Sequence, residues 1–182
     1  MNYKIIDNFL KKEFYNQLSK ILKSEKVPWY FKFEDTTHYS NNKNGFFSHC
    51  FYNYDKPDSD LYIPFILPIL EKLNYISCVQ VRANLCLRDK DAIESGYHMD
   101  YNNSNVTTAI LYLTTCDAKT VLNINNEEIF IDSIENRLLI FNAKTLHKAI
   151  YQKDTHKRYV INFNYIEGEK DGNIKITNDK TS

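Results

Sequence analysis

Hydrophobic and polar positions follow two different periods along this chain. In "FLKKEFYNQLSKIL", residues 9–22, large apolar residues recur at helical spacing, and Asp7 or Asn8 precedes them as a candidate cap. The helix is expected to end before Pro28, because the residue that precedes a proline avoids the helical region. A first helix is therefore predicted near the N-terminus.

A second helical stretch follows in "SDLYIPFILPILEKLNY", where apolar residues again line one side. Ser59 or Asp60 can cap this helix, and Pro64 fits its first turn. Pro68 lacks an N–H and is expected to kink or shorten the helix.

From Ile76 onward the period becomes that of strands. Short β-favouring runs alternate with polar turns, and earlier in the chain a turn at Asn44-Gly45 separates two aromatic-rich runs that predict a pair of short strands. The later runs are "ISCVQVRANLCLR", "TTAILYLTT", "KTVLNI", "EEIFID", "NRLLIFNA", "KAIYQ" and "RYVINFNYI". Strands at such regular spacing favour a sandwich or barrel of the jelly-roll kind.

The chain is long enough for a single domain, which we expect over residues 1–166. Residues 1–75 would form a helical supporting part and residues 76–166 a jelly-roll core. Residues 167–182 are polar and low in aromatics, which predicts a loosely ordered tail.

Composition excludes several classes of protein. Of 182 residues, 43% are hydrophobic and 25% charged, as in ordinary globular proteins. Lys plus Arg and Asp plus Glu number 23 each, so no net charge favours nucleic acid or an anionic membrane. No apolar run reaches the roughly 20 residues of a membrane span, and the N-terminus lacks the layout of a signal peptide. The four cysteines form no CxxC pair, which favours reduced thiols in a cytoplasmic protein.

Candidate chemistry lies just before the run "TTAILYLTT", in "SGYHMDYNN". His98 and Asp100 are two positions apart, and such residues on an extended segment point to the same side. The pair alone is weak, since solvated loop residues give the same pattern. His147, which enters a strand after "NRLLIFNAKTL", supplies a third candidate ligand. Two histidines and one carboxylate on one face of a metal, with the other positions open, form the ligand set of iron(II) oxygenases.

The other histidines compete less well for this role. His156 lies in the charged turn "QKDTHKR", and as a ligand it would place Arg158 beside the metal, which would repel it. With His147 as the ligand, Arg158 faces inward at a distance and suits the far carboxylate of a dicarboxylic acid. His38 and His49 are interpreted as packed or surface residues, although His49 could line the mouth of a pocket.

The motifs "GYHMD", "TAILYLTT", "NRLLIFNAKTLHKAI" and "KRYVINFNYI", in this order and spacing, resemble the 2-oxoglutarate- and Fe(II)-dependent dioxygenases, nearest to the prolyl 4-hydroxylase-like branch. The resemblance covers roughly residues 76–166, and the first half is similar in pattern to small phage and bacterial members. It implies a mainly β fold, the double-stranded β-helix (a cupin-like jelly roll), with two N-terminal supporting helices. It also implies an enzyme that hydroxylates an aliphatic C–H bond while 2-oxoglutarate is oxidatively decarboxylated to succinate and CO₂.

The resemblance assigns roles to individual residues. Fe(II) would be held by His98, Asp100 and His147, with 2-oxoglutarate chelating the metal through its keto-acid end. Arg158 would meet the distal carboxylate of 2-oxoglutarate, and Tyr112 would share it. O₂ is the second co-substrate, and ascorbate is compatible as a reductant. Further contacts to 2-oxoglutarate are expected from Asn84, Arg82, Asn162 and Asn164.

Two departures from the prolyl-hydroxylase pattern leave the substrate open. The segment "TTCDAKTVL" is short and lacks the Gly-Gly turn that follows the "YL" strand in many of those enzymes, so the turn at residues 114–120 alters the expected strand pairing there. Arg158 stands where the collagen-type branch has lysine. A peptidyl proline, a small amino-acid-like molecule and a modified base all remain compatible with the same three ligands.

Three other functions fit parts of the sequence. A nucleic-acid demethylase of the same iron class would need a basic groove, for which the candidates are Lys144, Lys148, Lys153 and Lys157. A catalytically silent jelly-roll binding module would not need the whole ligand set. A zinc hydrolase would leave Arg158 without a role. The expected partner is a small molecule or peptide, with no nucleic acid and no membrane, and the sequence does not indicate an oligomeric state.

Overall fold

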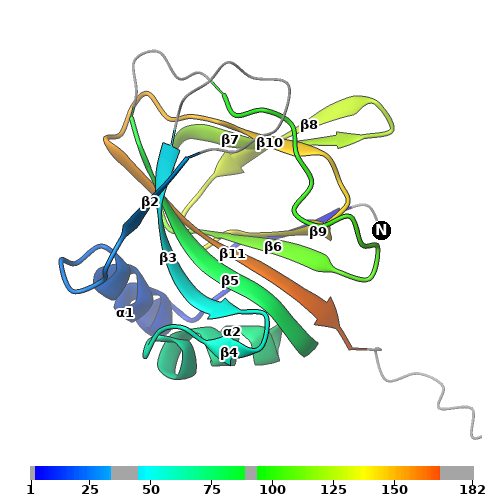
Figure 1. Ribbon diagram of the computed structural model, residues 1–182. Coiled ribbons are helices and arrows are strands. Elements are labelled where there is room, and N and C mark those ends of the chain that lie inside the picture. Colours follow the sequence, from blue (N-terminus) through cyan, green and yellow to red (C-terminus); the bar gives the residue numbers. More distant parts are fainter. Residues whose placement is uncertain (1–2, 34–44, 89–93, 169–182) are drawn as a thin grey trace, which may run out of the picture.

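The protein is described by a computed structural model over residues 3–33, 45–88 and 94–168 (Figure 1). Its elements in chain order are β1 (Tyr3–Ile6), α1 (Lys12–Leu22), β2 (Tyr30–Phe33), β3 (Gly45–Asn53), β4 (Lys56–Pro57), the π-helical turn η1 (Tyr62–Ile66), α2 (Leu67–Lys72), β5 (Tyr75–Leu87), β6 (Thr107–Tyr112), β7 (Cys116–Ile124), β8 (Glu127–Ser133), β9 (Leu138–Asn142), β10 (His147–Ile150) and β11 (Lys157–Glu167).

Within the described residues, the strands form two antiparallel sheets that face each other. The larger sheet has the order β1-β9-β6-β11-β5-β3-β2, with β4 paired to β3, and the smaller has the order β10-β7-β8. Figure 1 shows the smaller sheet at the top of the view, across from β6, β9 and β11. This arrangement is the predicted mainly β jelly roll.

The period-2 pattern of the central strands separates the helix side of the larger sheet from its inner side. On β5, residues Val81, Ala83 and Leu85 are buried in an apolar cluster with both helices, which we call the helix-side core. The alternate β5 residues line a cavity between the sheets: Arg82, Asn84 and Cys86. The same alternation on β11 sends Ile161 and Phe163 to the helix-side core and Arg158 into the cavity.

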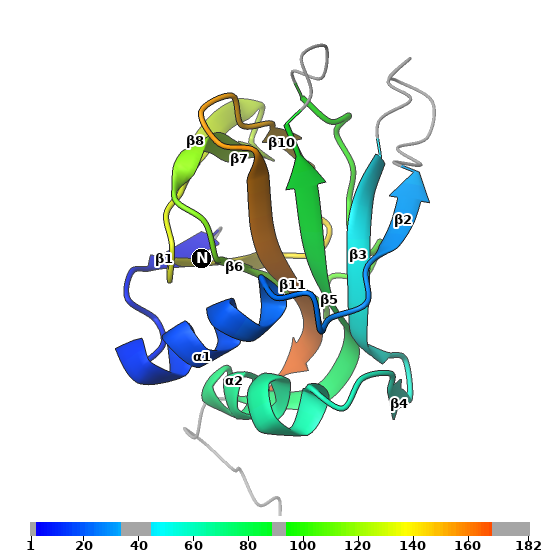
Figure 2. The ribbon, with the colours of Figure 1, turned by 90° about the vertical axis from the view of Figure 1, so that its left-hand side faces the viewer.

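The helix-side core is formed where α1 and α2 cover the larger sheet, as Figure 2 shows. On α1, Tyr15, Leu18 and Leu22 are buried at helical spacing, which explains why this segment forms a helix against a sheet. A second cluster lies between the sheets, and we call it the inter-sheet core. Its buried members are Ile110, Tyr112, Leu122, Ile131, Leu139, Phe141 and Val160.

The predicted cap of the first helix is wrong. The helix begins at Lys12, its N-cap Lys11 makes no side-chain capping bond, and Asn8 has a positive φ of 52°. Asp7 instead forms a bidentate ion pair with Arg137, at 2.6 and 3.0 Å. The reason is that residues 3–6 form an edge strand on β9, so the chain must turn before the helix starts. The predicted end before Pro28 is confirmed.

The second helical stretch is divided, as Pro68 suggested. A π-helical turn carries Pro64, and the regular helix α2 starts at Leu67 with Pro68 in its first turn, where a missing N–H has no cost. Ser59 accepts a hydrogen bond from the backbone N–H of Leu61 through its hydroxyl, at 3.2 Å.

Strands from the first part of the chain complete the larger sheet. β2 and β3 pair with each other, and the predicted turn at Asn44-Gly45 falls partly outside the described residues. β11 extends to Glu167, and Gly168 donates its backbone N–H to the Asn74 carbonyl, so the chain is ordered slightly beyond the predicted boundary. The remainder of the predicted tail lies outside the described residues.

Candidate metal and co-substrate site

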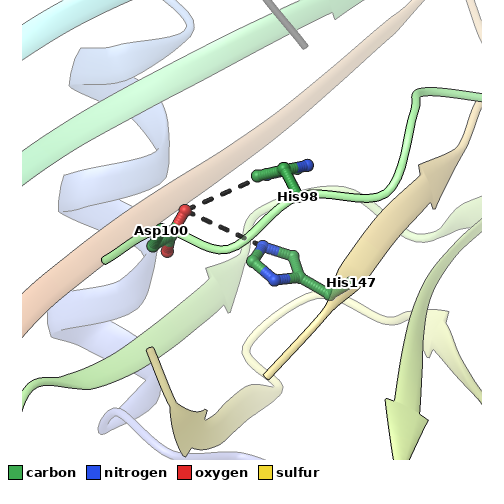
Figure 3. Close-up of side chains that lie close together, drawn as sticks. All are labelled: His98, Asp100 and His147. Carbon is green, nitrogen blue, oxygen red and sulfur yellow. Dashed lines mark ion pairs between the residues drawn. The ribbon is translucent and has the colours of Figure 1, made fainter. Parts of the chain in front are cut away.

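The side chains of His98, Asp100 and His147 converge on one point at the edge of the space between the sheets, as Figure 3 shows. One ligand atom from each lies within 4.8 Å of the others. Asp100 Oδ1 is 3.9 Å from His98 Nε2 and 3.8 Å from His147 Nε2. Asp100 and His147 are almost fully buried, whereas the His98 side chain is 35% exposed, so the cluster is open on the His98 side.

Backbone carbonyls select the ligating nitrogen of each histidine. His147 Nδ1 lies 3.0 Å from the Thr145 carbonyl, and His98 Nδ1 lies 3.2 Å from the Gly96 carbonyl. A carbonyl can only accept, so each Nδ1 donates a proton to its carbonyl, and Nε2 is the nitrogen of each ring that is directed at Asp100. Two imidazoles that ligate through Nε2 and one carboxylate on one side, with open positions opposite, fit Fe(II).

The segment before β6 is fixed to β10, which brings the two histidines together. His98 and His147 form an antiparallel bridge with backbone bonds of 3.0 and 2.9 Å in the two directions. The Ser95 N–H donates to the Ala149 carbonyl at 2.8 Å, and the Ala149 N–H donates to the Ser95 side-chain hydroxyl at 2.9 Å. Lys148 adds ion pairs to Glu94 and Glu128, on the segment and on β8. Strand-like pairing therefore holds the segment that carries His98 and Asp100 against β10, which carries His147.

Arg158 lines the same cavity as His98 and His147, and it is 3% exposed. Its Nε lies 3.4 Å from Ser133 Oγ, and its guanidinium lies over the Tyr112 ring at 5.7 Å from the centroid. None of the described carboxylates forms an ion pair with it. A cation buried in this way is costly unless an anion joins it, so the cavity is suited to an anionic ligand.

Three further polar atoms of the cavity are buried without a hydrogen-bond partner in the described structure. They are Arg82 Nε, Asn84 Oδ1 and Asn162 Oδ1. The three residues line the same cavity, of about 100 Å³, as His98 and His147. Buried polar groups are nearly always paired, so these atoms are suited to bind a polar ligand.

Tyr112 is not among the residues that line the cavity. It is fully buried in the inter-sheet core, and its hydroxyl donates to Thr120 Oγ1 at 2.7 Å. Thr120, on β7, lines the cavity. Burial raises the pKa of Tyr112 despite the nearby Arg158, so its hydroxyl keeps its proton. Sequence analysis missed Thr120 because its run, "KTVLNI", alternates as any half-buried strand does.

Asn164 is likewise not among the residues that line the cavity. The structure places this buried side chain against Thr108 on the neighbouring strand, with Oδ1 2.7 Å from Thr108 Oγ1. Thr108 in turn lies 2.9 Å from Asp100 Oδ2. Asn164 is therefore linked to Asp100 through Thr108, a residue that the sequence analysis did not single out.

The remaining described histidines lie apart from the cluster. His156 is exposed in its turn, which agrees with the preference for His147. His49 is 5% exposed and lies between Pro28 and Ser59, in keeping with its interpretation as a packed residue. His38 lies outside the described residues.

Tyr101 and Met99 alternate with the ligands and flank the cluster. Burial, with an additional contribution from Tyr54, raises the pKa of Tyr101 to about 12, so this hydroxyl remains neutral beside Asp100. Met99 is 42% exposed. Both residues are next to Asp100 in the chain, and neither is among the residues that line the cavity.

Neither a protein-family model nor a curated protein matches the chain, but solved structures do. A prolyl hydroxylase from Trichoplax adhaerens, in complex with a hypoxia inducible factor oxygen degradation domain peptide fragment, has a TM-score of 0.67 at 19% identity, covering 91% of this chain and 84% of that one. An oxidoreductase of the 2OG-Fe(II) oxygenase family from Burkholderia pseudomallei has a TM-score of 0.69 at 9% identity, covering 90% and 85%. A Pseudomonas putida prolyl-4-hydroxylase has a TM-score of 0.57 at 11% identity, covering 92% and 94%.

The chain therefore has the double-stranded β-helix fold of the 2-oxoglutarate- and Fe(II)-dependent oxygenases, with structural neighbours among the prolyl hydroxylases and an intact His-Asp-His triad. The organisms of these neighbours give no support to the phage-like character suggested for the first half. Among the described residues, no helix is long and apolar enough to cross a membrane.

Proposed function

We propose that this protein is a 2-oxoglutarate- and Fe(II)-dependent dioxygenase that hydroxylates an aliphatic C–H bond of a peptidyl proline or a small amino-acid-like substrate. His98, Asp100 and His147 would hold the iron through Nε2, Oδ1 and Nε2. The iron, when bound with 2-oxoglutarate and O₂, supplies the oxidising chemistry, and the protein supplies binding, orientation and exclusion of water.

The unpaired cation in the cavity carries the assignment of the co-substrate. Arg158 is buried and has no acidic partner among the described residues. The candidate metal ligands His98 and His147 line the same cavity. A dicarboxylate that reaches from the metal to this guanidinium would supply the missing anion, and a guanidinium can bind a carboxylate through two parallel bonds. 2-Oxoglutarate is such a molecule.

The orphaned polar atoms support the same ligand. Arg82 can donate through Nε, and the amides of Asn84 and Asn162 can turn to present either their oxygen or their NH₂ group. Tyr112 would contribute a hydroxyl directly or through Thr120. We retain all four in the proposed 2-oxoglutarate site and place Asn164 behind the metal instead.

The proposed substrate class rests on the neighbours and on the border of the site. The Trichoplax adhaerens enzyme was solved with a peptide fragment. Here Phe46 lines the cavity with the Arg82 guanidinium over its ring, and Tyr101 stands next to Asp100. Lys148, a candidate for a basic groove, is neutralised by two glutamates, which disfavours a nucleic-acid substrate. None of the four cysteines forms a disulfide, in keeping with a cytoplasmic protein in which ascorbate would serve as reductant.

An anaerobic titration tests the function. Fe(II) followed by 2-oxoglutarate is added to metal-free protein, and the visible charge-transfer band of the chelate is recorded. We expect the band in the wild type and its loss in Asp100→Ala, because that variant lacks one ligand. A folded wild type that gives no band would overturn the proposal in favour of a jelly-roll binding module. A band of equal intensity in Asp100→Ala would remove Asp100 from the metal site.

A further inference from the structure

The two carboxylate oxygens of Asp100 face different neighbours. Oδ1 is directed at both histidines, at 3.9 and 3.8 Å from their Nε2 atoms. Oδ2 faces away from them and lies 2.9 Å from Thr108 Oγ1. Thr108 is fully buried on β6, and the Asp100 side chain is 4% exposed, so water does not supply this bond.

Thr108 has a second close partner, and a hydroxyl has only one proton. Its Oγ1 lies 2.7 Å from the Asn164 side-chain oxygen, which is 2% exposed as a residue. Thr108 cannot donate to both Asp100 and Asn164. An ionised carboxylate can only accept, whereas the Asn164 amide presents NH₂ to Thr108 when turned by half a rotation. The arrangement that satisfies every atom has Asn164 donating to Thr108 and Thr108 donating to Asp100.

The strand register holds this chain of hydrogen bonds in place. Thr108 and Asn164 are directly paired residues of the antiparallel strands β6 and β11, so their side chains stand next to each other on the same face. Arg158 and Asn162 precede Asn164 on that face of β11 and line the cavity. β11 therefore carries Arg158 and Asn162, which line the cavity. Further along, it carries Asn164, whose side chain contacts Thr108 beside Asp100.

We propose that Asn164 and Thr108 are positioning residues that fix the carboxylate of Asp100 through a relay, Asn164 N–H to Thr108 and Thr108 O–H to Asp100 Oδ2. The relay rests on the proposed metal site. By occupying Oδ2, it leaves Oδ1 alone for the metal, so that Asp100 binds through one oxygen. A free carboxylate could turn and use both oxygens, which would take a position that the co-substrate or O₂ requires. Outer partners of ligating carboxylates affect metal affinity in this way.

The first test replaces the donor while keeping its shape. Thr108→Val is compared with Thr108→Ser and wild type in anaerobic titrations with Mn(II), read by displacement from a metal-indicator dye. We expect Thr108→Val to bind the metal about 10–100-fold more weakly and Thr108→Ser to remain close to wild type. Thermal unfolding of the metal-free proteins shows whether the loss is specific to the metal. Unchanged affinity in Thr108→Val would overturn the relay alone, and a wild type that binds no metal would overturn the relay and the proposed function together.

The second test asks whether Asn164 acts through Thr108. Asn164→Leu removes the amide at similar volume, and we expect a smaller loss of Mn(II) affinity than in Thr108→Val, because Thr108 retains its proton but not its anchor. In the double variant the loss should equal that of Thr108→Val, since residues in one chain of hydrogen bonds are not additive. Losses that multiply in the double variant, or an Asn164→Leu affinity equal to wild type, would overturn the role of Asn164.

Discussion

At the residue scale, the chemistry of the site depends on which atom of each side chain is already engaged. The carbonyls of Gly96 and Thr145 engage the Nδ1 atoms of His98 and His147. The result is that Nε2 of each histidine and a carboxylate oxygen of Asp100 lie close together before any metal arrives. Such preorganisation reduces the ordering that metal binding requires.

Arg158 gives the prediction that belongs to this scale. Arg158→Gln should raise the KM for 2-oxoglutarate by about 30-fold or more, the equivalent of roughly 2 kcal/mol for a lost buried charge pair. Arg158→Lys should have a smaller effect, because it keeps the charge and loses the fork. Rates of succinate formation at varied 2-oxoglutarate concentration measure this, and kcat at saturation should change little. A KM unchanged in Arg158→Gln would show that the dicarboxylate binds elsewhere.

Residue types could be predicted from the sequence more readily than the atoms they use. The motifs that contain His98, Asp100 and His147 predicted a cluster that the structure forms, since the residue types of a motif can be read directly from the sequence. The partner of Asn164 could not be predicted, because it depends on the pairing register of β6 and β11. Tyr112 illustrates the same limit, because the residue at its hydroxyl, Thr120, belongs to the other sheet.

At the element scale, a buried histidine, His49, joins three separate segments of the chain through hydrogen bonds. His49 on β3 donates from Nδ1 to the Pro28 carbonyl at 3.0 Å and accepts at Nε2 from the Ser59 hydroxyl at 2.9 Å. These partners lie before β2 and before η1. The strand pattern predicted β3 but not this junction, because the residues that His49 joins lie in irregular chain.

His49 makes stability depend on pH in a defined direction. Burial lowers the pKa of His49 below its ordinary value of 6.5. As the pH falls below that value, the unfolded chain takes up a proton that the folded chain refuses, so this contribution is present above it and is lost toward lower pH. His49→Gln should cost about 1–3 kcal/mol at pH 7.5, and the gap to wild type should narrow toward pH 5. Urea unfolding at each pH measures the gap, and a gap that stays constant would show that His49 does not titrate as proposed.

At the scale of the whole molecule, the residues proposed to bind the metal and 2-oxoglutarate come from both sheets. His147 stands on β10 of the smaller sheet and Arg158 on β11 of the larger one. The regular spacing of short strands predicted the two-sheet fold. How the sheets are placed against each other is set by the inter-sheet core, whose members come from five strands, β6, β7, β8, β9 and β11.

A co-substrate that spans from the metal to Arg158 should therefore stabilise the molecule as a whole. A ligand that binds only the folded state stabilises it by about 2.7 kcal/mol at a hundredfold excess over its Kd, which for a domain of this size is about 5–10 °C in Tm. We expect Mn(II) alone to raise Tm, 2-oxoglutarate alone to raise it little, and the two together to raise it most, because the keto acid needs the metal. The matched controls are Asp100→Ala, which should respond to neither ligand, and Arg158→Gln, which should respond to Mn(II) but gain little from 2-oxoglutarate. Differential scanning calorimetry under nitrogen measures these responses. An equal shift with 2-oxoglutarate in the presence and absence of Mn(II) would mean that the co-substrate does not bridge the metal and Arg158.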